Sequence, residues 1–447
     1  MFGSQDLQDD RLIIFGRYPV PGQTKTRLIP DLGPAGAAEL QRQLTEKALT
    51  TARAYTQGRG IELGFYFEGG NTKKMSQWLG SGMIFSEQEP GDLGVRMRAA
   101  FLKSFQSGRR RVVLIGTDIP GLSIDLLDKA FEALTGHDVV IGPSTDGGYW
   151  LIGMQHPVNL FQDIDWGTET VFEQTIALAK KQGMGVHLLN PLTDIDTVED
   201  LTALSSDLTQ RRPYVSIIIP TLNEEDIIES TIHRARNRDA EIIVVDGGST
   251  DGTIARAAGT GACVVTASCG RANQQNRGAE LAGGRMLLFL HADTHLPDDY
   301  IGHIFEAMMD PMTATGAFRF KTDLETPLIK VIEFMTNLRS IYFKMPYGDQ
   351  GLFIRKALFE SMGGFPDLPI MEDFELMRRI KKKGRVITLP VSVITSGRRW
   401  LNLGVVKTTI INQIVIAAYF MGVSPGRIAL WYQNKRRKVN YYDYNKN

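Results

Sequence analysis

The sequence predicts two tandem α/β domains, each built on a mostly parallel central sheet. Short apolar runs alternate with amphipathic stretches along the chain, which is typical of strands joined by crossover helices. A second observation is internal: VVLIGTDIPGLSIDLLDKAFEAL at 112–134 and MLLFLHADTHLPDDYIGHIFEAM at 286–308 follow one pattern. In both, an apolar run leads to an aspartate, a proline and a helical segment that contains Phe-Glu-Ala. The repetition indicates two domains of one architecture.

Eight apolar runs are predicted as strands, because each is short and followed by turn residues or an amphipathic stretch. They lie at 12–17, 64–67, 112–116, 138–142, 215–220, 241–245, 263–267 and 286–291. A polar stretch between the fourth and the fifth run marks a boundary. We therefore assign a first domain to 1–205, a linker to 206–212, a second domain to 213–400, and a C-terminal helix with a basic tail to 401–447.

The bulk composition is that of a soluble globular protein, with 43% apolar and 22% charged residues in a chain of 447. The 50 Lys and Arg residues balance 50 Asp and Glu residues, which gives no reason to expect nucleic-acid binding. Cys263 and Cys269 are too few for a disulfide framework, and we expect both in the core around a strand. Because 1–10 is polar and acidic, we expect no signal peptide and a cytoplasmic protein.

The C-terminal end departs from this balance, since the chain beyond residue 396 contains nine Lys and Arg residues but only one acid, Asp443. The stretch 405–423 is the most apolar, but Lys407, Asn412 and Gln413 interrupt it. A bilayer span needs about 20 almost uniformly apolar residues. We expect a helix that packs on the body of the protein, with an interfacial or self-pairing helix as alternatives. The basic tail is either solvated or a peripheral contact for anionic lipid.

A cationic loop that contains glycine follows the first predicted strand. The segment GRYPVPGQTKTRLIPDLG carries Arg17, Lys25 and Arg27. Cations combined with closely approaching backbone N–H groups suit a polyphosphate. The GxxxxGK[ST] pattern of a Walker loop is absent. The alternative is an ordinary basic surface loop.

Three aspartates of the first domain are candidate ligands of a cation. Asp118 ends its predicted strand, and Asp194 and Asp196 stand two residues apart in TDIDTVEDL. In an extended segment such residues share a face, so both could approach a hard cation at Asp118. For Asp194 and Asp196 alone, helix capping is the alternative. In STDGGYW, Gly147 and Gly148 stand beside an acid and two aromatics, where we expect nucleotide binding.

Taken together, KTRLIPDLG, GTDIPGL, STDGGYW and DIDTVEDL resemble the nucleotidyltransferase-like GT-A domains that include 2-phospholactate guanylyltransferase. They resemble most the uncharacterised glycosyltransferases linked to arsenosugar biosynthesis. The resemblance covers about 10–205. It implies a bound NTP or nucleotide-sugar, with Arg17, Lys25 and Arg27 on its phosphates and Mg²⁺ held by Asp118 with Asp194 or Asp196. The GxG run usual in the first loop of nucleotidyltransferases is absent, which leaves the activity of this half open.

Two strand-end aspartates mark the second domain. Asp246 ends a strand in EIIVVDGGSTDGT, where it can accept hydrogen bonds from a base or ribose while Gly247 allows close approach. Asp293 follows in HADTHLP, a variant of Asp-x-Asp in which His291 replaces the first acid. A divalent ion at Asp293 would bridge diphosphate oxygens. Imidazole ligates Mn²⁺ but suits Mg²⁺ poorly, so His291 is either a ligand or a group that orients water or phosphate.

Two later segments carry further candidates. Glu372 and Asp373 in MEDFEL stand at the start of a helical stretch, where helix capping is the alternative to catalysis. Arg398, Arg399 and Trp400 follow later in the chain. Arg could contact a diphosphate and Trp could stack on a sugar; the alternative is a packing Trp with solvated arginines.

The ordered series PTLNEE, VDGGSTDGT, HAD, GDQG, GGF and MED resembles that of inverting family 2 glycosyltransferases over about 214–400. Within that family the segment is similar to members linked to arsenosugar biosynthesis and, more distantly, to carotenoid-acid glycosyltransferases. The resemblance implies that Asp373 is the general base. It also implies a nucleotide-sugar cradle made of Pro220, Asn223, Glu224, Asp246, Gly247 and Asp293, with Arg398, Arg399 and Trp400 beside it.

We therefore expect an inverting glycosyltransferase that uses Mg²⁺ or Mn²⁺ and moves a sugar from a nucleotide-sugar to a small or lipid-like acceptor. The first domain is expected to make the sugar nucleotide or to transfer by itself. The alternatives are a sugar-phosphate or small-acid nucleotidyltransferase with a non-catalytic second domain, a bifunctional phosphoryl-transfer enzyme, and a non-catalytic nucleotide-sugar-binding scaffold. The sequence leaves open the sugar, the base, the acceptor and the oligomeric state, a homodimer through 405–421 included.

Overall fold

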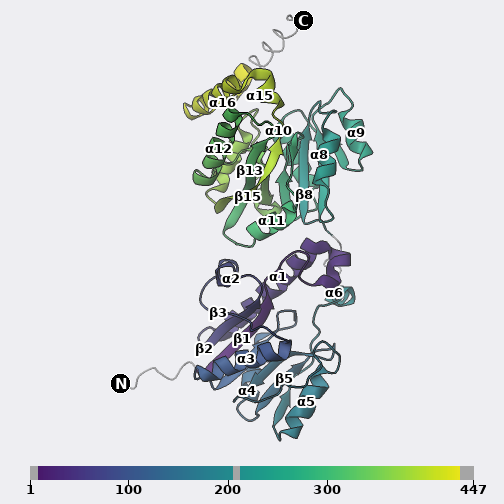
Figure 1. Ribbon diagram of the computed structural model, residues 1–447, viewed down its shortest axis with the longest axis vertical. Helices are drawn as coiled ribbons and strands as arrows, with labels where there is room; N and C mark the ends of the chain where they lie inside the picture. Colours follow the sequence, from purple (N-terminus) through teal and green to yellow (C-terminus); the bar gives the residue numbers. More distant parts are fainter. Residues whose placement is uncertain (1–8, 205–211, 433–447) are drawn as a thin grey trace, which may run out of the picture. The chain divides into compact units, whose positions relative to one another are not determined.

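The computed structural model describes residues 9–204 and 212–432, which divide into two compact units, Met1–Arg211 and Arg212–Asn447 (Figure 1). All but the last residue of the predicted linker, and the basic tail beyond residue 432, lie outside the described residues. Within the described ranges, none of the helices combines the length and apolar character that crossing a bilayer requires.

The first unit is built on a seven-stranded sheet in the order β3-β2-β1-β4-β6-β5-β7. Its strands are β1 Asp10–Arg17, β2 Ile61–Glu68, β3 Ile84–Glu87, β4 Arg111–Ile115, β5 Val139–Pro143, β6 Tyr149–Met154 and β7 Val186–Leu188. Strand β6 runs antiparallel to β4 and β5, and the other neighbouring strands pair in parallel. The carboxyl ends of β1, β2 and β4 therefore meet at one edge of the sheet.

Helices connect these strands and pack on the sheet. They are α1 Ile29–Thr56, α2 Thr72–Leu79, α3 Leu93–Gln106, α4 Ile124–Ala133, α5 Val171–Lys181 and α6 Val198–Leu204, with the short 3-10 helix η1 Thr26–Leu28 before α1. Asn71, Asp92 and Ser123 cap α2, α3 and α4, because each side-chain oxygen accepts the backbone N–H three residues on. Phe101 of α3 packs with Ile13 and Val112 of the strands in one buried cluster.

The second unit has an eight-stranded sheet in the order β10-β9-β8-β11-β14-β13-β15-β12. The strands are β8 Val215–Thr221, β9 Ala240–Asp246, β10 Cys263–Thr266, β11 Met286–Phe289, β12 Thr294–His295, β13 Thr313–Thr322, β14 Leu352–Arg355 and β15 Arg385–Thr395. The helices are α8 Ile228–Ala235, α9 Thr253–Gly259, α10 Arg271–Leu281, α11 Tyr300–Ala307, α12 Pro327–Tyr342, α13 Lys356–Ser361, α14 Glu372–Ile380, α15 Arg398–Leu403 and α16 Val405–Phe420, with the 3-10 helix η2 Gly348–Gln350.

The two sheets share one strand order. When the two-residue strand β12 is set aside, each sheet places its third, second, first, fourth, sixth, fifth and seventh strand side by side. Strand β14 is antiparallel to β11 and β13, as β6 is to β4 and β5. Strands β4 and β11 thus hold equivalent positions, and the aspartates that follow them, Asp118 and Asp293, do so too. The predicted fold class, two tandem GT-A-type α/β domains with mostly parallel sheets, is confirmed.

One expectation about the second unit is wrong. Cys263 and Cys269 are both free and exposed, whereas the sequence suggested that they lie in the core. The physical reason is that Cys263 lies on β10, the edge strand of the sheet, and Cys269 lies in the loop between β10 and α10. An apolar-looking run such as CVVTA reads alike at an edge and in the middle of a sheet.

Candidate functional site

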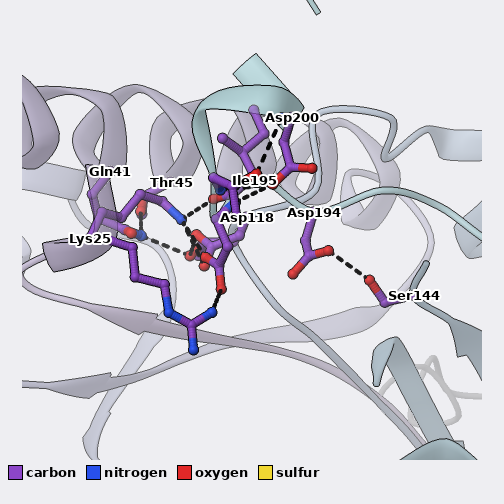
Figure 2. A network of polar contacts seen from close by, with 12 residues as sticks. Lys25, Gln41, Thr45, Asp118, Ser144, Asp194, Ile195 and Asp200 are labelled. Atoms are coloured by element: carbon purple, nitrogen blue, oxygen red, sulfur yellow. Dashed lines mark hydrogen bonds and ion pairs between the residues drawn. The ribbon is translucent and has the colours of Figure 1, made fainter. Parts of the chain in front are cut away.

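In the first unit, Lys25 lies between two of the predicted aspartates (Figure 2). Its Nζ atom is 3.2 Å from Asp118 Oδ2 and 3.2 Å from Asp196 Oδ1. It also donates a hydrogen bond of 2.5 Å to the carbonyl oxygen of Ile195. The Lys25 side chain is 4% exposed, whereas both carboxylates stay partly open to solvent. An ammonium group of the chain thus occupies the space between two carboxylates that the sequence assigned to a metal ion.

The backbone explains how these distant segments meet. Lys25 itself adopts the left-handed conformation, with φ of 46°, and this turns the chain into η1. On the other side, the N–H of Ile195 donates to the carbonyl oxygen of Asp118 at 3.0 Å. The segment around residue 195 therefore lies along the end of β4, which brings Asp118 and Asp196 to one place.

Helix α6 is capped by residues other than the predicted acids. Asp200 Oδ2 accepts the backbone N–H of Thr197 at 2.7 Å, and the Asp200 N–H donates to the Thr197 hydroxyl at 3.4 Å. This reciprocal pair is a capping box with Asp in the acidic position. Asp194 and Asp196 are thereby free of the capping role that the sequence offered as the alternative.

The third aspartate, Asp194, turns toward the STDGGYW segment instead of Lys25. The Ser144 hydroxyl donates to Asp194 Oδ1 at 2.9 Å (Figure 2). Burial, and then the charge of Asp146, raises the pKa of Asp194 above its ordinary value. Gly147 is required by the turn: its φ is +89°, and a Cβ there would stand 2.1 Å from the carbonyl oxygen of Glu169. The Gly148 N–H donates to Asp146 Oδ1 at 3.0 Å.

The two arginines predicted to bind phosphate differ in their surroundings. Arg17, at the end of β1, pairs with Glu68 at the end of β2, with Nη2 2.6 Å from Oε2. Arg27 is 75% exposed, and its Nη1 is 3.7 Å from Asp196 Oδ2. Across 9–204 and 212–432, no three His, Cys, Asp or Glu side chains converge as a complete metal site would need. A cation between Asp118 and Asp196 would therefore need further oxygens, from a ligand or from water.

In the second unit, Asp246 organises the turn that follows β9. Its carboxylate is buried and accepts the N–H groups of Gly248 and Ser249 at 2.8 Å each, together with the Ser249 hydroxyl. Asn223 adopts a left-handed conformation and joins this turn, because its Oδ1 accepts the Thr250 N–H at 2.9 Å. The loops after β8 and β9 are thus fixed to each other, and the Asp246 oxygens are already used within the turn.

Two other members of the predicted cradle lie at the same strand ends. Pro220 pairs in register with Val245 near the end of β8. The Gly247 N–H donates to the Thr221 carbonyl at 2.9 Å, and a Cβ on Gly247 would stand 3.0 Å from the Gln274 side chain. Gly247 therefore allows α10 to approach the loop closely, which is a packing role next to the predicted ligand.

Arg398 lies between Glu224 and Asp293. Its Nη2 atom is 2.9 Å from Glu224 Oε2 and 3.9 Å from Asp293 Oδ2. Burial raises the pKa of both carboxyls above their ordinary values, although the guanidinium acts in the opposite direction. The Ser396 N–H donates to the Asp293 carbonyl at 2.9 Å and so fixes the start of α15 to the end of β11. In both units, a cation of the chain therefore lies against the aspartate that follows the fourth strand.

The neighbours of Arg398 in sequence take other positions. Trp400 packs on Phe320, with ring centroids 5.9 Å apart, which agrees with the packing alternative stated above. The side chain of Arg399 lies outside the described part of the structure. Of these three residues, the structure thus brings Arg398 to the strand-end acids.

Asp373 is held by the loop that contains η2. Its Oδ2 atom accepts the Gly348 N–H at 2.9 Å, and its Oδ1 atom accepts the N–H of Phe374 at 2.7 Å. A Cβ on Gly348 would lie 3.1 Å from His291 Nε2 and 3.5 Å from Asp373 Oδ2. His291, after β11, and Asp373 therefore both border Gly348. The N-cap of α14 is Met371, so Asp373 does not serve as that cap.

Glu372 is a site residue that sequence reasoning left as a cap. Its side chain is 8% exposed, and Arg271 Nη1 is 3.8 Å from its Oε1. Burial, followed by the negative charge of Asp373, raises the pKa of Glu372 to about 7. Two adjacent acids at a helix start usually face solvent, so only the tertiary structure reveals that one of them is buried.

This burial predicts a pH-dependent effect of Glu372→Gln on stability. Because the folded pKa of about 7 exceeds the ordinary 4.5, the folded state binds the additional proton. The stability contribution is complete below the ordinary pKa and is lost as the pH rises toward the folded one. We expect Glu372→Gln to raise the free energy of unfolding above pH 7, by on the order of 3 kcal/mol at most. Urea unfolding at acidic and at mildly alkaline pH measures this.

Glu360→Gln is the matched control, because Glu360 is an exposed acid on α13. It should leave the free energy of unfolding unchanged at both pH values. If Glu372→Gln destabilised the protein equally at both pH values, Glu372 would be ionised and paired throughout, and our interpretation would be wrong.

Comparisons with known proteins assign the two units to families. Residues 51–168 match the family described as an uncharacterized protein conserved in bacteria (DUF2064), and residues 216–363 match glycosyl transferase family 2. A PGL/p-HBAD biosynthesis glycosyltransferase from Mycobacterium bovis (strain BCG / Pasteur 1173P2) is 28% identical over 221 residues, 45% of this chain and 82% of the relative.

Among solved structures, a "putative nucleotide-diphospho-sugar transferase" from Desulfovibrio desulfuricans G20 is 34% identical, with a TM-score of 0.42. The match covers 45% of this chain and 87% of that chain. The family 2 match contains Asp246, His291 and Asp293 and ends before Asp373. The second unit therefore contains a glycosyl transferase family 2 domain, and the first unit contains a DUF2064 domain ahead of it.

Proposed function

We propose that the second unit transfers a sugar from a nucleotide-sugar to an acceptor hydroxyl with inversion, and that Asp373 is the general base. The observation that carries this proposal is the position of Asp373 beside His291 across Gly348. Since His291 stands two residues before Asp293, the base and the predicted diphosphate-binding acid belong to one edge of the sheet. Ligands of open α/β sheets bind at this edge.

The transfer follows from these positions. The acceptor oxygen attacks the anomeric carbon, Asp373 takes the hydroxyl proton, and the bond from that carbon to the diphosphate oxygen breaks. The Gly348 N–H orients the carboxylate by binding one oxygen. Arg398 is close enough to Asp293 to offset charge on the departing diphosphate.

A divalent cation, Mg²⁺ or Mn²⁺, belongs to the proposal. Carboxylates suit both ions, and Asp293 would hold the cation, with Glu224 available through the Arg398 contact that both share. When bound, such a cation supplies Lewis-acid stabilisation of the diphosphate. His291 remains either a ligand or a group that orients water.

For the first unit we propose nucleotide binding, with an activity that makes the sugar nucleotide. Lys25 and the exposed Arg27 would meet the phosphates, which would free Asp118 and Asp196 for Mg²⁺. Gly147 and Gly148 support this by shaping the turn that holds Asp194 close by. A role in arsenosugar biosynthesis rests on the resemblance of the motifs alone and is proposed on that basis.

Calorimetric titration tests both units at once. UDP- and GDP-sugars and NTPs, each with Mg²⁺ or Mn²⁺, are titrated into the wild-type protein, Asp118→Ala and Asp293→Ala. We expect Asp293→Ala to weaken nucleotide-sugar binding at least tenfold, a loss of about 1.4 kcal/mol or more, and to leave NTP binding intact. Asp118→Ala should do the reverse.

The outcomes separate the alternatives. NTP binding and pyrophosphate release without glycosidic product would favour the nucleotidyltransferase with a non-catalytic second domain. Nucleotide-sugar binding without turnover would favour the scaffold. Absence of binding by the wild-type protein would contradict both sites.

A further inference from the structure

Helix α12 presents an apolar face that its own unit leaves uncovered. Leu328, Val331, Phe334 and Met335 are all exposed, and Phe334 reaches 63%. Their spacing of three and four residues puts Leu328, Val331 and Met335 on one side of the helix, with Phe334 adjacent. Ile329 is buried and marks the opposite side. Four exposed apolar side chains on one helix of a well-packed unit indicate a surface that binds an apolar partner.

Helix α16 and the turn after it present a second such face. Val415 and Tyr419 point inward, since they pack in one cluster with Phe374. Ile410, Ile414 and Phe420 are exposed, Phe420 at 69%. The helix thus packs on the body of the unit, as expected from the sequence, and still leaves Ile410, Ile414 and Phe420 exposed.

A series of side-chain contacts runs from the C-terminal end of α12 to α16, past the residue that follows Asp373. The Arg339 guanidinium of α12 lies 3.4 Å above the ring of Tyr347, and Tyr347 contacts Phe374 at 6.4 Å between centroids. Phe374 in turn contacts Tyr419 and Phe420 of α16 at 5.5 and 5.4 Å. In Figure 1, α12 runs along one side of the unit, below α16. We call the exposed faces of these two helices the α12–α16 surface; it borders the residue that follows Asp373.

The positive charge around the α12–α16 surface favours an anionic partner. Between residues 397 and 432, the sequence holds four Lys and Arg residues and no Asp or Glu. Lys330, Lys344, Lys407 and Arg427 are exposed on or beside the two helices. A second copy of the chain would bring the same excess of cations to the contact, and like charges repel. Anionic lipid headgroups are attracted to such a surface.

We propose that the α12–α16 surface seats on a membrane that contains anionic lipid, and that the acceptor of the transferred sugar is a lipid-linked hydroxyl in that membrane. The second clause rests on the proposed transferase function, and the first does not. Apolar side chains enter the interface between headgroups and acyl chains, while the cations contact the headgroups. Because Phe420 of the surface contacts Phe374, the residue that follows Asp373, a hydroxyl displayed at the headgroup level would lie near the proposed base.

Vesicle co-sedimentation of the full chain tests the membrane contact. Vesicles of phosphatidylcholine alone are compared with vesicles rich in phosphatidylglycerol, at low and at high NaCl. We expect binding to the anionic vesicles that weakens with salt, because headgroup attraction is screened. Phe334→Glu and Phe420→Glu should each reduce the bound fraction about tenfold, in line with losing one buried aromatic side chain.

Met312→Glu is the matched control. Met312 is 63% exposed, like Phe334, but precedes β13 and belongs to neither helix. It should sediment with vesicles as the wild-type protein does. Wild-type binding that neither Phe variant reduces, or no binding to anionic vesicles together with a dimer in analytical ultracentrifugation, would overturn the proposal. Phe334→Glu should bind the nucleotide-sugar in calorimetry as the wild-type protein does, because only its membrane contact is removed. A loss of vesicle binding is thereby distinguished from a loss of the proposed transferase function.

Discussion

Asp373→Asn is expected to reduce kcat of sugar transfer by about 10²–10⁴-fold, the usual contribution of a general base. An amide cannot take the proton of the acceptor hydroxyl, but its oxygen can still accept the Gly348 N–H that holds the native carboxylate. The fold of the loop and the binding of the nucleotide-sugar should therefore persist. Initial rates of nucleoside diphosphate release, measured with calorimetric titration of the same preparation, give both quantities.

Asp367→Asn serves as the control for this prediction, because Asp367 is an exposed acid in the loop before α14. Its kcat should equal that of the wild-type protein. A kcat of Asp373→Asn within tenfold of the wild-type value would show that another group takes the proton, and the buried neighbour Glu372 would be the first to examine.

The second large effect is expected for Lys25→Met in the first unit. Removing the ammonium leaves Asp118 and Asp196 facing each other, with the exposed Arg27 guanidinium, 3.7 Å from Asp196, to offset their charge in part. Breaking a fully buried ion pair costs about 3–5 kcal/mol, and the partial exposure of both carboxylates reduces this to about 1–3 kcal/mol. The loss should appear as a lower Tm of the unfolding transition of this unit.

The same variant should gain a response to metal. With the ammonium gone, Mn²⁺ can take its place between the carboxylates, so we expect Mn²⁺ to raise the Tm of Lys25→Met in the absence of nucleotide. The wild-type protein should respond to Mn²⁺ only with an NTP present. Arg27→Met, which removes an exposed cation 3.7 Å from Asp196, should change Tm little and is the control. A Tm of Lys25→Met equal to that of the wild-type protein would contradict the buried ion pair.

The ends of the strands were predictable because the strands themselves are visible in the sequence. Buried parallel strands are apolar throughout, so the residues that end β4, β9 and β11 can be located from the apolar runs alone. Strands β6 and β14 were not among the predicted runs. Even an apolar run such as YWLIGM looks alike in either direction, and its partners β4 and β5 are chosen by tertiary packing.

The contacts of the charged residues were harder to predict from the sequence, because they too depend on the tertiary structure. Lys25 was recognised as a cation in a loop, but its contact with Asp196 joins residues 171 positions apart. Nothing local in the sequence distinguishes a lysine that will bind phosphate from one that bridges two carboxylates. The exposed face of α12 went unnoticed because an amphipathic pattern shows where apolar residues lie, whereas only packing shows whether they are covered.

Phe374 links Asp373, the proposed base, to helix α16, and this has a kinetic consequence. Phe374 is held between Tyr347 and the rings of Tyr419 and Phe420, so the placement of α16 reaches Asp373 through one peptide unit. With Asp373 as the base and α16 on a membrane, as proposed, we expect turnover to rise when α16 is immobilised at the interface. Its rate on an acceptor dispersed in solution should lie below its rate on the same acceptor in a bilayer, and the progress curve after vesicle addition should accelerate before it becomes linear.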